Sequence, residues 1–279
     1  MTEWIVLSNF YIFSKRNIRY LKAALWLYAY SIYSPRRGRR IRYALCCLQW
    51  MDDLIDGDRK LKSGSDEQLM LYFEQLKCAL RGSASWPMHS YELRQLSKLL
   101  RKFVQSVEKT RQKEVSQSLC ALINNMLFDR ERTMDRVLLT EAELLKHHHE
   151  TFEKSFSVLL IALGSPLKSR DCPELCDLLG WVSSTRDLGE DLTRGLVNIP
   201  METLLKASPD FKNSDLNFRV NQVLHHESVK MWKKLYRNEA AQWLKAASSR
   251  IEDLSQKYKV GFFQFMLWTI RAYYRQTSV

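Results

Sequence analysis

Apolar residues along this chain do not alternate with polar ones in the way that marks a strand. No alternating run of Val, Ile or Thr of strand length stands out, and Leu, Lys, Arg, Glu and Gln, which favour helices, dominate. Breaks between helices are expected where Gly, Pro and Ser gather: at Ser34-Pro35 and Gly57-Asp58, and in residues 82–87, 164–173, 198–200 and 208–214. The pattern predicts an all-α protein.

The length of the chain allows one large domain. It has 279 residues and a mass of 33.0 kDa, with only nine Gly and six Pro. This length is sufficient for a substantial core, and no linker argues for a second domain. We therefore predict a single helical domain over residues 1–279.

The charge of the chain predicts an anionic partner. The formal net charge is +12 and the pI is about 9.4. Nucleic acid, an anionic membrane surface and a polyphosphorylated substrate all suit such a charge, and charge alone does not choose among them. Nucleic-acid binding would account for the arginines of residues 36–42 but not for the acidic motifs described below, since carboxylates repel phosphate unless a metal intervenes. No nucleic-acid partner is predicted.

Cysteine usage and apolar runs bear on the cellular location. The six cysteines show no CxxC spacing and most have apolar neighbours, which favours reduced thiols in a cytoplasmic protein. No signal peptide is recognised at the N-terminus, and the apolar run of residues 23–33 is too short to cross a bilayer. Gln264 and Arg271 interrupt the aromatic run of residues 260–274. We interpret that run as a helix packed on the core, with peripheral contact at a membrane surface as the alternative.

Two pairs of aspartates carry the candidate chemistry. Asp52 and Asp56 form one pair, and Asp187 and Asp191 form the other. A spacing of four places two carboxylates on one helical face, roughly 6 Å apart along the axis. A solvated acidic face would explain either pair alone. Because apolar residues surround both, we expect the carboxylates to line a cavity and to hold Mg²⁺, which bridges to the phosphates of substrates.

The residues around both pairs resemble a known family. Residues 34–45, followed by Asp-Asp-Leu-Ile-Asp-Gly at 52–57, are similar to the first aspartate-rich segment of the squalene and phytoene synthases, and residues 186–200 to their second. Residues 123–129 look like a weaker version of a third segment. The resemblance covers residues 20–205 and implies an all-α class I isoprenoid synthase fold with a central cavity. It also implies Mg²⁺ as cofactor and an allylic isoprenyl diphosphate as substrate, such as farnesyl or geranylgeranyl diphosphate.

The resemblance assigns roles to particular residues. Carboxylate and hydroxyl oxygens would bind Mg²⁺, and these are on Asp52, Asp53, Asp56, Ser183, Asp187 and Asp191. Polar side chains would contact the diphosphate and aromatic ones would shield the carbocation. These substrate-binding candidates are Gln49, Arg186, Arg194, Trp26, Tyr30 and Phe152, and ordinary core packing is the alternative for each aromatic ring. The catalytic set comprises the four paired aspartates and His147.

Several positions depart from the family pattern. Gln49 stands where the family has an Arg that helps to hold a diphosphate, Leu25-Trp26 replaces a Ser-Phe pair, and Asn124 replaces an Asp. Residues 147–156 replace a Tyr-Cys stretch and a face of small residues. Larger and charged side chains at Glu153, Lys154 and Phe156 would narrow the cavity at that wall or make the wall more polar.

The three adjacent histidines at 147–149 point about 100° apart on a helix and cannot all bind one ion. His147 falls at the family's tyrosine position, where it would accept a proton or contact the diphosphate. A solvated or capping role for the histidines is the alternative.

Two reactions fit these residues. One is ionisation of a single allylic diphosphate followed by ring closure or proton loss, as in a terpene synthase. The other is head-to-head coupling of two such diphosphates, as in squalene, dehydrosqualene or phytoene synthase. The missing arginine and the altered wall favour the first, because a second substrate would have fewer groups to bind it. A non-catalytic partner subunit is a third alternative, and the oligomeric state is left open.

Overall fold

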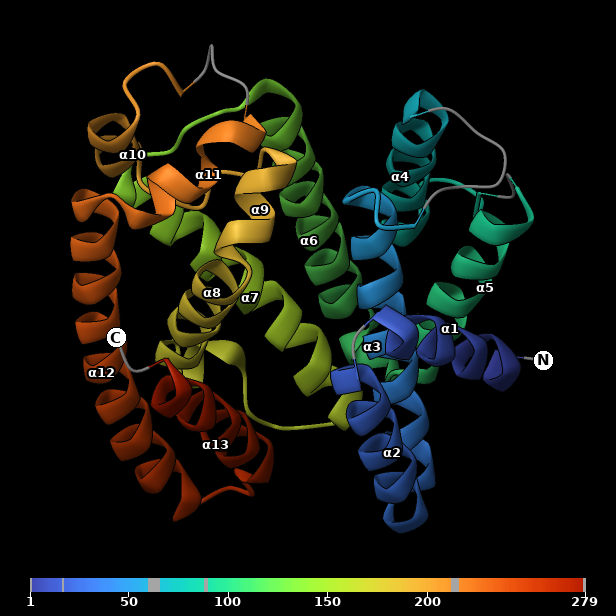
Figure 1. The fold of residues 1–279 in the computed structure, drawn as a ribbon. Helices are drawn as coiled ribbons and strands as arrows, with labels where there is room; N and C mark the ends of the chain where they lie inside the picture. The colour runs from blue at the N-terminus through green and yellow to red at the C-terminus, as the bar shows by residue number, and fades with distance from the viewer. Residues whose placement is uncertain (1, 17, 60–65, 88–89, 212–215, 278–279) are drawn as a thin grey trace. The chain divides into compact units, whose positions relative to one another are not determined.

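The computed structural model describes residues 2–16, 18–59, 66–87, 90–211 and 216–277. These residues form thirteen α-helices and one short 3-10 turn and contain no strand (Figure 1). The prediction of an all-α protein is confirmed. The class I isoprenoid synthase fold and its central cavity stay predictions.

The helices group into two compact units, each described by itself. Unit 1 comprises the chain up to Met126 together with Lys154–Pro166, and unit 2 comprises Leu127–Glu153 together with the chain from Leu167 onward. Helices α6 (Lys109–Asp135) and α7 (Glu141–Leu163) contribute residues to both units. The prediction of one domain over residues 1–279 stays a prediction.

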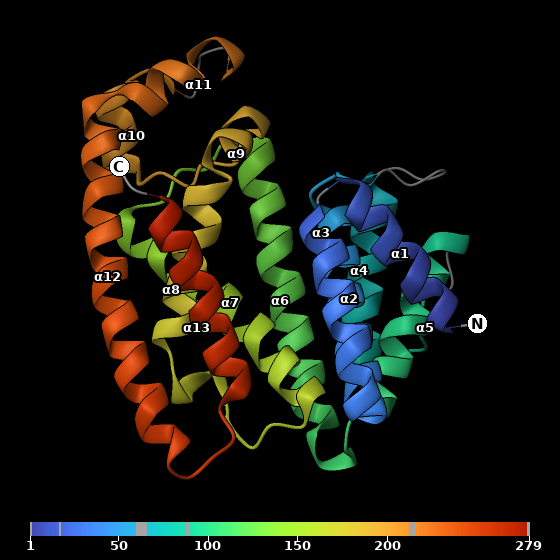
Figure 2. The same ribbon diagram turned by 60° about the horizontal axis from the view of Figure 1, so that its bottom comes forward.

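Helix α3 is the central element of unit 1. It packs against α1, α2 and α5, and the ribbon shows α1, α2 and α3 next to one another (Figure 2). Its buried face includes Cys46, Cys47, Trp50 and Met51. The helices of this unit that precede α6 are α1 (Thr2–Arg16), α2 (Ile18–Tyr33), α3 (Pro35–Ile55), α4 (Asp66–Leu80) and α5 (Tyr91–Ser106).

Helix α8 has the corresponding place in unit 2. It packs against α12 and α13, and the Trp181 ring contacts Tyr273 with ring centroids 5.4 Å apart. The elements that follow α7 are η1 (Ser169–Asp171), α8 (Glu174–Arg186), α9 (Leu188–Arg194), α10 (Met201–Ala207), α11 (Leu216–His225), α12 (Glu227–Ser255) and α13 (Gly261–Gln276).

The aromatic run of residues 260–274 forms most of helix α13. Phe263, Leu267 and Ile270 are buried where α13 packs on α8 and α12. The run is therefore a helix packed on the core, as the first interpretation holds. Among the described residues, no helix is both long and apolar enough to span a bilayer.

The predicted breaks coincide with helix ends. Helix α2 ends just before Ser34, α3 ends two residues before Gly57, and α4 ends before residues 82–87. The breaks at 164–173 and 198–200 also fall between helices. Ser208 follows α10, while residues 212–214 of the last predicted break lie outside the described residues.

All six cysteines are free thiols. Burial raises the pKa of Cys47 well above its ordinary value and that of Cys172 to about 12. These side chains therefore stay protonated at neutral pH and act as small apolar residues of the core.

Helices α2 and α3 approach closely at Gly38. A Cβ at this position would lie 2.1 Å from Ser31 Oγ and 2.6 Å from Ser31 Cα. The Ser31 hydroxyl also accepts a hydrogen bond from the buried Arg42 and donates one to the Leu27 carbonyl at 2.7 Å. Because a backbone atom is involved, the helices would have to separate to accept a side chain.

We predict that Gly38→Ala lowers the free energy of unfolding by about 1–3 kcal/mol, because it overpacks this crossing. Gly261→Ala is the control, since no atom lies within 4 Å of its Cβ, and its effect should stay within about 0.5 kcal/mol. Urea denaturation followed by circular dichroism measures both. Equal stabilities for the two variants would contradict the close approach.

Candidate aspartate site

The first aspartate motif ends helix α3 in unit 1. Asp52 and Asp53 lie in its last turn, and Asp56 is the C-cap, whose backbone N–H donates to the Asp52 carbonyl at 2.9 Å. Helical geometry thus continues through Asp56, so Asp52 and Asp56 share one face. Asp53 is buried and Asp56 is exposed. The predicted pairing of carboxylates on one face is present in this motif.

Gln49 contacts the motif carboxylates directly. Its amide Nε2 donates to Asp53 Oδ1 at 2.7 Å and to Asp52 Oδ2 at 3.3 Å. Gln49 therefore orients two aspartates without adding positive charge. Arg59 supplies a cation nearby but is engaged by Glu92 and lies 4.5 Å over the Trp50 ring.

The second motif spans the junction of α8 and α9 in unit 2. Asp187 is both the C-cap of α8 and the N-cap of α9. Its backbone N–H donates to the Ser183 carbonyl at 3.2 Å, and the Asp191 N–H donates to the Asp187 carbonyl at 2.9 Å. This ladder places the three side chains on one face, as the sequence predicts.

The two predicted substrate arginines flank this face. Arg186 Nε donates to Asp187 Oδ1 at 2.8 Å, and Arg194 Nη2 donates to Glu190 Oε1 at 2.5 Å. Both guanidinium groups are exposed, so these contacts are weak enough to be exchanged for an anionic ligand.

Asp191 differs electrostatically from an ordinary surface carboxylate. Burial and, to a lesser extent, the nearby charge of Asp187 together raise its pKa to about 7, although the Asn198 amide, which donates to Oδ2 at 2.9 Å, acts in the opposite direction. The charged form of Asp191 is therefore costly in the absence of a cation. A divalent ion on this face would relieve that cost.

A buried polar network connects Asp191 to His147. Asn198 Oδ1 accepts a hydrogen bond from Arg132 Nη2 at 3.3 Å, and Arg132 Nη1 donates to Asp129 Oδ1 at 2.7 Å. Asp129 in turn contacts His147 Nε2 at 2.9 Å. Arg132 is fully buried, and its Nη2 also donates to the Val197 carbonyl. The network draws on α6, α7, α9 and the segment after α9.

The charges within this network determine its protonation states. Burial raises the pKa of Asp129, but His147 and Arg132 outweigh this effect and hold the pKa below its ordinary value. Burial lowers the pKa of His148 to about 4, so its ring is neutral at physiological pH. Asp129 and Arg132 thus form an ion pair that stays charged.

The network also fixes the ring of His147. The Phe128 ring meets it edge to face, with centroids 5.3 Å apart. When His147 is neutral and donates its Nε2 proton to Asp129, Nδ1 is left as the ring atom that can accept a proton. The sequence indicates His147 but not Arg132 and Asn198 as members of its network, because only the fold brings these residues together.

The remaining predicted substrate residues are aromatic. Trp26 is partly exposed and stacks on Tyr30 with ring centroids 5.7 Å apart in unit 1, while Phe152 is partly buried in unit 2. Three cavities among the described residues of unit 1 have no motif aspartate in their walls. A role for these rings in shielding a carbocation stays a prediction.

The donor set of each motif suits Mg²⁺ that retains other ligands. Within the described ranges, no group of three or more His, Cys, Asp or Glu side chains is close enough to hold a metal ion. Each motif instead offers two carboxylates on one face. In the second motif, Ser183 adds a hydroxyl to this face. Mg²⁺ commonly binds one or two carboxylates and takes its other ligands from water and phosphate. The two motifs belong to different units, so their joint action stays a prediction.

Comparisons with protein-family models and with curated proteins find no match for this chain.

We predict that Asp191→Asn changes the pH dependence of stability. The folded-state pKa of about 7 lies above the ordinary value of 3.8, so the folded protein binds the extra proton and loses stability as the pH rises from 3.8 to about 7. The variant removes this loss and should be more stable than the native protein at pH 8, by about 2–4 kcal/mol. Near pH 4 the gain should vanish.

Urea denaturation across this pH range measures the effect, with the exposed Asp210→Asn as the control. At pH 8, added Mg²⁺ should increase the free energy of unfolding of the native protein more than it increases that of the Asp191→Asn variant. The prediction is contradicted if the stability of the native protein, relative to that of the variant, does not fall between pH 4 and pH 7. Asp191 would then not be the perturbed carboxyl.

Proposed function

We propose that the protein is a Mg²⁺-dependent terpenoid synthase that ionises an allylic isoprenyl diphosphate and releases diphosphate. The observation that carries this proposal is the face of Ser183, Asp187 and Asp191, where burial raises the pKa of Asp191 to about 7. Such a face favours a cation, and the sequence holds a second pair at Asp52 and Asp56. The resemblance to the squalene and phytoene synthases supports the same chemistry.

The proposed roles follow from the chemistry of the residues. Mg²⁺ would be held by Asp52 and Asp56 in unit 1 and by Ser183, Asp187 and Asp191 in unit 2. When bound, Mg²⁺ neutralises the charge that the diphosphate gains as the carbon–oxygen bond breaks. Arg186 and Arg194, which are exposed beside the second motif, would contact the same leaving group.

His147 is the proposed proton acceptor. An allylic cation with no second prenyl group to attack must close a ring, capture water or lose a proton. Asp129 and Phe128 hold the imidazole in one orientation, which would direct its free nitrogen toward one proton of the substrate. Arg132 anchors Asp129 and acts as a positioning residue in this scheme.

Head-to-head coupling of two isoprenyl diphosphates is the alternative reaction. It requires groups that neutralise a second diphosphate. Gln49 carries no charge and is bonded to Asp52 and Asp53, which favours the single-substrate reaction.

We predict Mg²⁺-dependent release of diphosphate from an allylic substrate. Geranyl, farnesyl and geranylgeranyl diphosphate would be incubated with the protein, with and without Mg²⁺. Asp52→Asn and Asp187→Asn should each lower the rate by about 100-fold, because each removes charge that stabilises the leaving group. Asp210→Asn, which changes an exposed aspartate outside both motifs, should retain the native rate.

The mass of the hydrocarbon product distinguishes the two reactions. A product with the carbon number of its substrate supports the single-substrate reaction, and one with twice that number supports head-to-head coupling. Release that needs no metal, or full activity in both motif variants, would overturn the proposal.

A further inference from the structure

Helix α1 has an exposed apolar face. Trp4, Leu7, Tyr11 and Ile12 are all exposed, and Trp4 has 75% of its surface accessible. Their spacing of three, four and one residues places them on one side of the helix, opposite the buried Val6, Phe10 and Phe13. A helix with no other contact than its own unit would be expected to have polar residues on this exposed side.

Helix α2 repeats this feature. Leu25, Trp26, Ile32 and Tyr33 are exposed, with 79% of the surface of Ile32 and 88% of that of Tyr33 accessible. They lie on one side of the helix, away from the buried Ala24 and Leu27. Two neighbouring helices thus expose large apolar and aromatic side chains, which marks an interaction surface.

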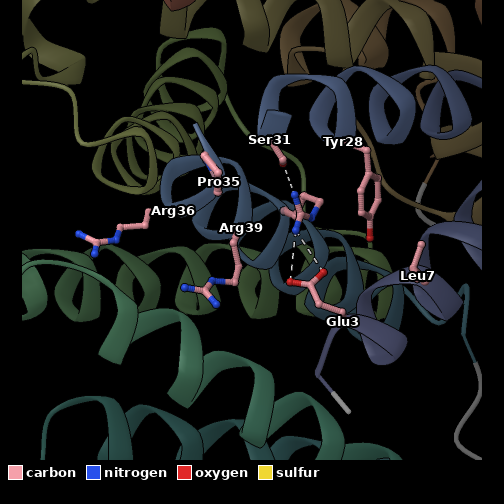
Figure 3. Close-up of a pocket in the computed structure, with 8 residues that line it drawn as sticks. Glu3, Leu7, Tyr28, Ser31, Pro35, Arg36 and Arg39 are labelled. Carbon is pink, nitrogen blue, oxygen red and sulfur yellow. Dashed lines mark hydrogen bonds and ion pairs between the residues drawn. The ribbon is translucent and has the colours of Figure 1, made fainter. Parts of the chain in front are cut away.

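A cavity of about 440 Å³ lies among helices α1, α2 and α3. Leu7 and Tyr28 lie at one end of it, and Arg36 and Arg39 lie at the other (Figure 3). The cavity also contacts the apolar faces, because Leu7 belongs to the face of α1 and Tyr28 is one turn before Ile32 on α2. We call these two faces and this cavity the α1–α3 surface.

The cavity carries positive charge that is not paired within its walls, as far as the described residues show. Its one carboxylate, Glu3, is paired with the buried Arg42 at 3.2 Å. In the described part of the chain, neither Arg36 nor Arg39 has an ion-pair partner, and both are exposed. Their guanidinium groups are free to meet an external anion.

The sequence concentrates this charge. Residues 1–51 contain nine Lys or Arg and a single acidic residue, Glu3. They therefore supply a net charge of eight out of the twelve of the whole chain. No other part of the sequence of this length has such an excess.

We propose that the α1–α3 surface binds the face of an anionic phospholipid bilayer. The exposed Trp, Tyr, Leu and Ile side chains would enter the interface between head groups and acyl chains, and lipid phosphates would meet Arg36 and Arg39 in the cavity. This combination selects a membrane over nucleic acid, because a duplex would satisfy the arginines but leave Trp4, Ile32 and Tyr33 in water. Helix α13 belongs to unit 2, where its apolar side is largely packed on α8 and α12.

The proposal is tested by sedimentation with vesicles of phosphatidylcholine alone and of equal parts phosphatidylcholine and phosphatidylserine. The native protein should bind the anionic vesicles, and binding should weaken as salt is raised. Arg36→Gln and Arg39→Gln should each weaken binding roughly fivefold. Trp4→Ser and Ile32→Ser should each weaken it about tenfold.

The control variants change similar residues elsewhere. Trp268→Ser replaces a tryptophan of α13 that is 67% accessible, and Lys234→Gln and Lys245→Gln each remove one exposed charge of α12. All three should bind as the native protein does. Because every altered side chain is exposed, the variants should keep the native circular dichroism spectrum.

Several results would overturn the proposal. Equal binding to neutral and anionic vesicles, or a larger effect of the controls than of Trp4→Ser and Ile32→Ser, would place the contact elsewhere. The surface would be assigned to nucleic acid if two results were found together. The protein would fail to bind vesicles, and it would bind duplex DNA tightly in a way that depends only on Arg36 and Arg39. The proposal stands or falls independently of any turnover of isoprenyl diphosphates.

Discussion

A carboxylate that is withdrawn from solvent needs a positive partner or a raised pKa, and the partly buried Asp129 and Asp191 of unit 2 are examples of the two cases. Asp129 has the guanidinium of the fully buried Arg132, and its pKa lies below the ordinary value. Asp191 has the neutral amide of Asn198 as its hydrogen-bond donor, and its pKa rises to about 7. The chain of hydrogen bonds therefore ends in an ion pair near His147 but in a carboxylate with a neutral donor at Asp191. A divalent cation would supply what that end lacks.

Local features of the fold could be predicted from the sequence. Pro35, Gly57 and the Gly and Pro residues of 164–173 mark helix ends, since these residues interrupt a helix by rules that need no tertiary contact. The end of α6 was missed because it has no Gly or Pro: Arg136 adopts φ of 49° and the Val137 N–H donates to the Arg132 carbonyl at 3.1 Å. The aspartate faces were predictable for the same local reason. Arg132 and Asn198 were not, because they are 66 residues apart in sequence and only packing joins them.

The proposed membrane contact and the proposed reaction make compatible demands on the molecule. An isoprenyl diphosphate has a long apolar tail and an anionic head, so it partitions to the surface of a bilayer as an amphiphile does. A protein that binds that surface meets such a substrate at a raised local concentration. Exposure of the α1 and α2 faces could not be predicted from sequence, since an apolar stripe on a helix is usually buried against the core.

The central proposal is that both aspartate pairs act on one diphosphate through Mg²⁺, a joint action that stays a prediction because the pairs belong to different units. Calorimetric titration of inorganic diphosphate in the presence of Mg²⁺, with the native protein, Asp52→Asn, Asp187→Asn and the double variant, tests it most directly. If the pairs share one ligand, each single variant should lose most of the binding free energy and the double variant little more, a coupling of at least about 1 kcal/mol. Losses that simply add, or binding that persists without Mg²⁺, would contradict the claim.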